Sequence, residues 1–102
     1  MEIRPFKPFG SVSALTLGGG GLGQVWGATT RDEAVATARL ALDSGITHFD
    51  MAPMYGRGEA ESVIGEAFKG TDKSNLRFTT KYRLGHVSPE QTYDKLNASL
   101  TR

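Results

Sequence analysis

The 102-residue chain contains no cysteine. This absence excludes disulfide bonds, thiolate chemistry and cysteine metal ligands, and it agrees with a reducing compartment. The chain also lacks an apolar run of the roughly 18 residues that a membrane span needs, and its start, MEIRPFKPFG, lacks the apolar stretch of a signal peptide. We therefore expect a cytoplasmic protein with no metal site and no membrane partner.

The sequence also lacks a clear excess of either positive or negative charge. The 12 basic and 11 acidic side chains leave a formal charge of +1, and they are scattered along the chain. Because no basic stripe is present, nucleic acid is not an expected partner. The length suits a single domain, residues 1–102, with a modest core.

The sequence does contain an alternation of strand-like and helix-like segments. Short apolar runs predict three strands, at Val12–Leu17, Ile46–Asp50 and Leu76–Tyr82. Apolar residues at helical spacing predict three helices, from Thr30 to Ser44, from Ala60 to Lys69 and from Ser88 toward Leu100. The order strand, helix, strand, helix, strand, helix is typical of parallel βα units, which indicates an α/β fold.

Local signals fix the predicted helix ends. Thr30 and Glu33 form a capping box before the first helix, and Gly45 supplies a left-handed stop after it. Ser88 and Gln91 repeat the capping box before the third helix, with a proline at its first position.

The glycine run LGGGGLGQVWG follows the first predicted strand. Gly18, Gly20 and Gly23 fit the pattern G-x-G-x-x-G of dinucleotide-binding loops. In a Rossmann fold the last of these glycines opens directly into a helix, whose free N–H groups hold the pyrophosphate. Here residues 24–29 intervene before Thr30, so this assignment is disfavoured. A flexible turn and a loop that a ligand approaches closely both remain open.

Three polar residues follow the strands. Asp50 ends the second predicted strand, Tyr55 lies in the loop after it, and Lys81 ends the third. The carboxyl ends of parallel strands form the functional face of such folds, so these side chains are expected to meet there. They suit proton donation, because a lysine charge favours the phenolate form of a tyrosine and an aspartate holds the lysine. A structural Asp50–Lys81 ion pair beside an unrelated tyrosine is equally consistent with the spacing.

Three stretches in register, GLGQVWG, FDMAPMYGRGEAESVIGEAF and FTTK, resemble the aldo-keto reductases. The usual family pattern is D-T-A followed by Y-G, then G-x-x-E-x-x-x-G, then T-K at the end of the next strand. The resemblance implies a (β/α)8 TIM barrel, here incomplete with three of its eight βα units, that reduces aldehydes or ketones to alcohols with NADPH. This chain has Asp-Met-Ala where Asp-Thr-Ala is commoner.

The resemblance also implies roles for individual residues. Tyr55 would protonate the carbonyl oxygen, Lys81 would tune Tyr55, and Asp50 would anchor Lys81 and border the cofactor. In the first βα loop, Gly23, Gln24 and Trp26 would lie at the nicotinamide end of the cofactor. For Gln24 the alternative is a surface amide, and for Trp26 it is an aromatic cover over the barrel mouth.

The fourth catalytic residue of the family, a histidine that ends the fourth strand, has no counterpart in the sequence. His48 lies two residues before Asp50 on the same strand face, where we expect a structural histidine. His86 is expected to be solvated.

Two hypotheses follow for the whole chain. The first is an N-terminal portion of an NADPH-dependent reductase, inactive alone because this family binds the adenosine phosphate end of the cofactor mainly through its last strands and their loops. The second is a noncatalytic α/β module that associates with itself or a partner through its open strand edges.

Overall fold

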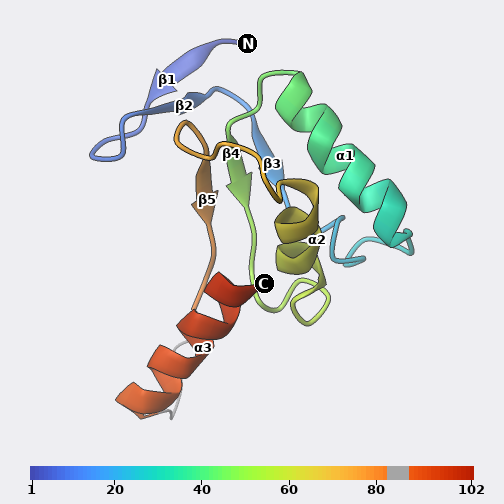
Figure 1. Ribbon diagram of the computed structural model, residues 1–102, viewed down its shortest axis with the longest axis vertical. Coiled ribbons are helices and arrows are strands. Elements are labelled where there is room, and N and C mark those ends of the chain that lie inside the picture. The colour runs from blue at the N-terminus through green and yellow to red at the C-terminus, as the bar shows by residue number, and fades with distance from the viewer. Residues whose placement is uncertain (83–87) are drawn as a thin grey trace.

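The computed structural model describes residues 1–82 and 88–102. Its elements, in chain order, are β1 (Ile3–Pro5), β2 (Ser11–Ser13), β3 (Thr16–Gly18), α1 (Arg31–Asp43), β4 (His48–Asp50), α2 (Glu59–Ala67), β5 (Arg77–Thr79) and α3 (Pro89–Thr101). The strands β3, β4 and β5 form a parallel sheet in that order, with β3 and β5 at its edges (Figure 1). The expected α/β class with parallel βα units is confirmed, and these three strands form an open sheet.

The prediction of one strand over Val12–Leu17 was wrong. That segment contains two short strands, β2, which pairs antiparallel with β1, and β3, which joins the parallel sheet. The chain bends between them because the Ser13 hydroxyl donates to the Leu15 carbonyl over 2.6 Å. The bend is also tied to the next unit: the Ser13 amide donates to Thr47 Oγ1, and the Thr47 amide donates to Ser13 Oγ, each over 2.8 Å.

The ends of α1 and α3 are as predicted, whereas α2 begins at Glu59 and ends at Ala67 instead of spanning Ala60–Lys69. Thr30 Oγ1 accepts from the Glu33 amide, and the Glu33 carboxylate accepts from the Thr30 amide, which completes the capping box of α1. Ser88 and Gln91 make the same reciprocal pair before α3. Gly45 follows α1 with φ of 93°, a left-handed conformation that glycine adopts without steric cost. These ends depend on contacts within one turn of helix, so the local sequence is sufficient to specify them.

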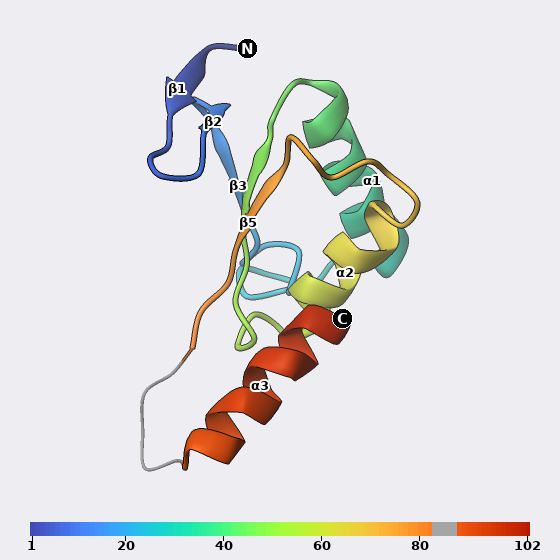
Figure 2. The same cartoon turned by 60° about the vertical axis from the view of Figure 1, so that its left-hand side comes forward.

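The core lies between one face of the sheet and the helices α1 and α2 (Figure 2). Phe49 of β4 is fully buried and meets the Phe68 ring edge-on, with centroids 4.9 Å apart. Ala38 of α1 and Val63 of α2 are likewise fully buried. The buried residues of α1 and of α2 recur at helical spacing, as in a helix with one face packed on a sheet. Burial of these apolar faces therefore stabilises both helices against the sheet.

The opposite face of the sheet is polar around His48. The His48 ring nitrogens lie 3.0 Å from Thr16 Oγ1 on β3 and 2.7 Å from Thr79 Oγ1 on β5. Phe6, from the turn between β1 and β2, packs on the same ring at a centroid distance of 5.0 Å. The expectation of a structural histidine is therefore confirmed, because both ring nitrogens are used in cross-strand contacts.

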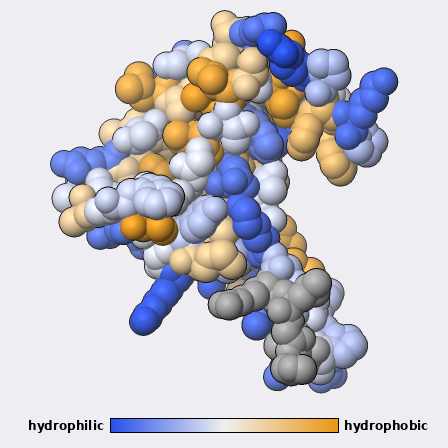
Figure 3. Space-filling model, turned by 180° about the vertical axis from the view of Figure 1, so that it is seen from behind, coloured by the Kyte–Doolittle hydropathy of each residue, from blue (hydrophilic) through white to orange (hydrophobic). Residues whose placement is uncertain are grey.

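From behind, hydrophilic side chains run down the middle of the surface, and hydrophobic ones gather mainly in its upper half (Figure 3). Of the helices in the described ranges, none is long and apolar enough to cross a membrane.

The segment after β5 departs from the predicted strand Leu76–Tyr82. The strand ends at Thr79, where the last backbone bond runs from the Met51 amide to the Thr79 carbonyl over 2.7 Å. Tyr82 therefore lies outside the sheet, and its hydroxyl is 2.8 Å from Thr92 Oγ1 on α3. Tyr82 thus contacts α3 from a loop rather than from a strand.

Candidate active site

Asp50 and Lys81 form an ion pair at the carboxyl end of the sheet. Asp50 is the last residue of β4, and Lys81 follows the end of β5, so parallel pairing brings the two to the same edge. The Lys81 Nζ atom donates to Asp50 Oδ1 over 2.8 Å and to the Met51 carbonyl over 2.9 Å. These contacts hold the ammonium at the edge of the sheet.

Tyr55 lies beside this pair. The centroid of its ring is 5.0 Å from Lys81 Nζ, and the half-buried ring packs against the core. After Tyr55 the chain turns sharply into α2 through three left-handed residues, Gly56 at 67°, Arg57 at 57° and Gly58 at 93°. A left-handed φ is uncommon outside glycine, so Arg57 adopts a conformation that its environment must stabilise.

Lys81 remains a cation under ordinary conditions. Burial alone would lower the pKa of Lys81, but hydrogen bonds to Asp50 and Tyr55 and their charges raise it above the usual lysine value. The site therefore places a positive charge between a carboxylate and a phenol. Such an arrangement stabilises negative charge on a phenol oxygen, which is what a tyrosine needs when it gives up a proton.

The glycine loop packs against the carboxyl end of β4. The Gly19 amide donates to the Asp50 carbonyl over 2.8 Å, which extends the pairing of β3 with β4 into the loop. Gly19 and Gly23 are buried, and a Cβ on Gly19 would lie 2.5 Å from Met51 Sδ. The loop then turns well before Thr30, so the described geometry agrees with the rejection of a Rossmann loop.

Gln24 and Trp26 leave this loop toward solvent. Gln24 has φ of 63°, the second left-handed residue other than glycine in the described chain, and both such residues belong to the loops around the site. Trp26 is 84% exposed, and its indole lies over Gly20, where a Cβ would be 2.8 Å from Nε1. The structure thus brings Gly23 to Tyr55 and leaves the side chains of Gln24 and Trp26 accessible.

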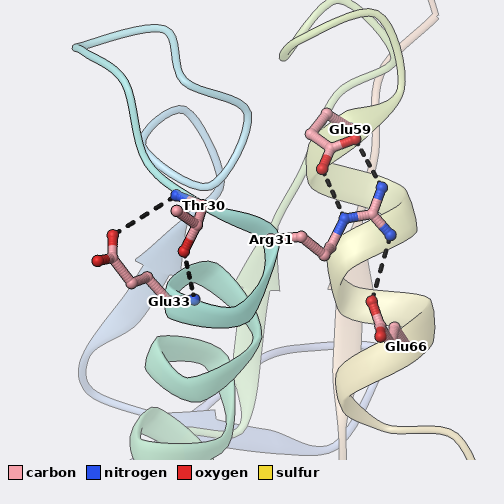
Figure 4. A network of polar contacts seen from close by, with 5 residues as sticks. All are labelled: Thr30, Arg31, Glu33, Glu59 and Glu66. Atoms are coloured by element: carbon pink, nitrogen blue, oxygen red, sulfur yellow. Dashed lines mark hydrogen bonds and ion pairs between the residues drawn. The ribbon is translucent and has the colours of Figure 1, made fainter.

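Arg31 links the two loops through the helices that follow them (Figure 4). Its guanidinium binds both Glu59 oxygens, over 2.6 and 2.7 Å, and Glu66 Oε2 over 3.2 Å. The hydrogen bond to Arg31 lowers the pKa of Glu59. Arg31 and Glu59 are the first residues of α1 and α2. Because parallel βα units place the starts of both helices at the same end of the sheet, these opposite charges were the signal that sequence reasoning missed.

Glu61, an acidic residue in the first turn of α2, was not identified from the sequence. Its side chain is 7% exposed and accepts hydrogen bonds from Thr80 Oγ1 and Arg102 Nη1, each over 2.6 Å. Burial by itself would raise the pKa of Glu61, but the hydrogen bonds from Thr80, Arg102 and Ser99 outweigh it and lower the pKa. The glutamate of the G-x-x-E-x-x-x-G pattern was the available signal.

His86 lies outside the described residues. Among residues 1–82 and 88–102, no three histidine or carboxylate side chains gather in a way that could hold a metal ion.

Comparison with known proteins identifies the family. The sequence profile described as the Aldo/keto reductase family matches residues 14–102. This chain belongs to that family. The aldo-keto reductase fold also accounts for the arrangement of β3, α1, β4, α2, β5 and α3 as consecutive parts of a parallel barrel.

Two related proteins are dehydrogenases by name. The chain is 36% identical over its full length to L-galactose dehydrogenase of Arabidopsis thaliana and covers 34% of that protein. It is 41% identical to pyridoxal 4-dehydrogenase of Microbacterium luteolum over 78% of the chain, which is 25% of that relative. The chain thus spans about a third of the length of the first protein and a quarter of the second.

A solved aldo-keto reductase has the same fold. The structure of an aldo-keto reductase from Klebsiella pneumoniae in complex with NADPH superposes on 98% of this chain with a TM-score of 0.82 at 29% identity. The chain covers 34% of that protein.

Proposed function

We propose that this chain forms the first βα units of an NADPH-dependent reductase that converts aldehydes or ketones to alcohols. The observation that carries the proposal is the Lys81 ammonium held by Asp50 beside the Tyr55 ring. Family membership supports it, because related proteins such as L-galactose dehydrogenase and pyridoxal 4-dehydrogenase are named as oxidoreductases. Residues 1–102 would then be one part of a single barrel domain.

In the proposed mechanism Tyr55 is the proton donor to the carbonyl oxygen. The positive charge of Lys81 stabilises the phenolate that forms as this proton leaves, and Asp50 holds the ammonium in position. The side chains of Asp50 and Lys81 are each a little more than one third exposed, so a ligand at the carboxyl end of the sheet can reach the pair.

The described residues fit one end of a nicotinamide cofactor. Trp26 presents an exposed indole on which a flat ring can stack, and Gln24 presents an exposed amide that can donate and accept hydrogen bonds. Gly23 and Asp50 complete the proposed contacts on the side of Tyr55. NADPH, when bound, would supply the hydride for the carbonyl carbon.

The second candidate function is noncatalytic association. The strands β3 and β5 are the edges of the described parallel sheet, and α3 has no buried residue. An open edge can pair with a strand of another chain. Under this alternative the 102-residue chain would form oligomers and show no NADPH consumption.

The test uses the protein encoded by the complete reading frame and follows NADPH absorbance with an aldehyde present. Tyr55→Phe keeps the ring and removes the proton donor, so the rate should fall at least about 100-fold. The matched control is Tyr93→Phe, because the Tyr93 side chain is exposed on α3. A Tyr55→Phe variant with the full rate contradicts the proposal.

A further inference from the structure

We propose that Glu61 is a positioning residue for Lys81 and acts through the hydroxyl of Thr80. The inference rests on the proposed function of Lys81. It gives the glutamate of the G-x-x-E-x-x-x-G pattern a role in the active site, although Glu61 itself lies on α2.

The argument begins where β5 ends. Its pairing with β4 stops at Thr79, and the next two residues, Thr80 and Lys81, lie beyond the strand. A backbone that has left the sheet gains freedom unless side chains restrain it. The direction of the Lys81 side chain therefore needs a restraint in addition to the sheet.

Thr80 supplies this restraint. Its Oγ1 donates to Glu61 Oε1 over 2.6 Å, a short bond to a charged acceptor. Successive side chains of an extended segment point to opposite sides. Thr80 is bound to Glu61 of α2, whereas the next residue, Lys81, reaches Asp50, which accepts from its ammonium over 2.8 Å.

The rest of the pattern holds Glu61 in place through Arg102. Arg102 Nη1 donates to Glu61 Oε2 over 2.6 Å. A Cβ on Gly58 would lie 2.6 Å from Arg102 Nε, and a Cβ on Gly65 would collide with the Arg102 carbonyl oxygen. Gly58, Glu61 and Gly65 share one face of the helix at spacings of three and four residues, so both glycines leave room for the arginine.

A helix-dipole role does not explain these contacts. An acidic residue in the first turn of a helix interacts with the dipole while fully solvated. Glu61 is instead 7% exposed, and burying a carboxylate is costly unless charged or hydroxyl donors compensate it. Thr80 and Arg102 provide that compensation at both oxygens.

The test compares Thr80→Val with Thr80→Ser. Both substitutions change the side chain by little, but only serine keeps the hydroxyl. The readout is the titration of the Lys81 amine, followed by NMR with 13C-labelled lysine in the full chain. Among the described residues, Asp50 and Tyr55 face this amine. Lys81 also lines a cavity of about 300 Å³, and the other cations that line it are Lys95 and Arg102.

In Thr80→Val the pKa of Lys81 should fall toward the ordinary lysine value of about 10.4, because the ammonium is no longer held against Asp50. Thr80→Ser should keep the wild-type titration. Glu61→Gln should act like Thr80→Val, and the control Glu66→Gln, an exposed glutamate of the same helix, should not change the titration of Lys81.

In the complete reductase, Thr80→Val should lower kcat by about tenfold to a hundredfold with little change in KM, as expected for misplaced catalytic geometry. A folded Thr80→Val with the wild-type Lys81 titration overturns the proposal, as does a Thr80→Ser variant that behaves like valine. If Glu61→Gln fails to fold, the comparison of Thr80→Val with Thr80→Ser still tests the proposal. If the wild-type protein reduces no carbonyl, the proposed function fails, whereas the Lys81 titration still tests the positioning role.

Discussion

Gly23 packs directly against the backbone of Tyr55. A Cβ on Gly23 would lie 2.5 Å from both the carbonyl carbon and the carbonyl oxygen of Tyr55 and 2.9 Å from its Cβ. Gly56 makes the reciprocal contact, because a Cβ there would collide with the Gly23 carbonyl. In the candidate site, the glycine of each loop therefore packs directly on the backbone of the other loop, at a distance that a residue with a Cβ atom does not permit.

Gly23→Ala should displace the Tyr55 loop. A methyl group at this contact forces backbone rather than a flexible side chain to move, and such overpacking costs about 1 to 3 kcal/mol of the free energy of unfolding. Urea denaturation measures this loss, and the reductase rate should fall with it. Gly18→Ala is the control, because a Cβ on Gly18 meets nothing within 4 Å. Equal stability of the two variants would show that the loop contact is unimportant.

Trp26 offers a direct probe of ligand binding at the glycine loop. It is the only tryptophan of the chain and is 84% exposed, so its fluorescence reports on this loop. If it borders the cofactor, titration with NADPH should quench the emission in a saturable manner. Trp26→Ala should weaken NADPH binding and change the free energy of unfolding by no more than about 0.5 kcal/mol, as is usual for exposed positions. A loss of stability without a change in binding would instead identify Trp26 as a cover.

Arg31→Met should loosen the contact between α1 and α2. Arg31 is 42% exposed and Glu59 28%, so solvent screens the pair, and we expect a loss of about 0.5 to 1 kcal/mol in the free energy of unfolding at low salt. The loss should shrink as salt is added. Arg4→Met, which removes a more exposed pair with Glu2, is the control and should have a smaller effect.

The same pair predicts a pH dependence. Because Arg31 lowers the pKa of Glu59, the stabilisation is present above the unfolded glutamate pKa of about 4.3 and is lost as the pH falls through the lower folded value. Wild-type protein should therefore lose its advantage over Arg31→Met below about pH 4. An advantage that persists in acid would contradict the proposed ion pair.

Much of the local structure was predictable from the sequence. The capping boxes at Thr30 and Ser88 and the stop at Gly45 were confirmed, because each depends on residues within about one helical turn. The splitting of Val12–Leu17 into two strands was not predictable, because it depends on Thr47, more than thirty residues later, which exchanges hydrogen bonds with Ser13 at a separation of 34.

The candidate site divides in the same way. Asp50, Tyr55 and Lys81 could be named from their positions after predicted strands, but their catalytic roles stay predictions. Arg31 with Glu59 and Glu61 with Thr80 were not identified, since the sequence showed only charges at helix starts.

By itself, the sequence determined the order of the βα units and the chemical types at the carboxyl ends of the strands, because hydrophobic period and capping act over short distances. Only the tertiary structure decided which groups meet. The parallel pairing of β4 with β5 places the Lys81 ammonium 2.8 Å from the Asp50 carboxylate, across 31 residues of chain. Such contacts depend on the packing of whole elements, which the burial of Phe49, Val63 and Phe68 makes possible.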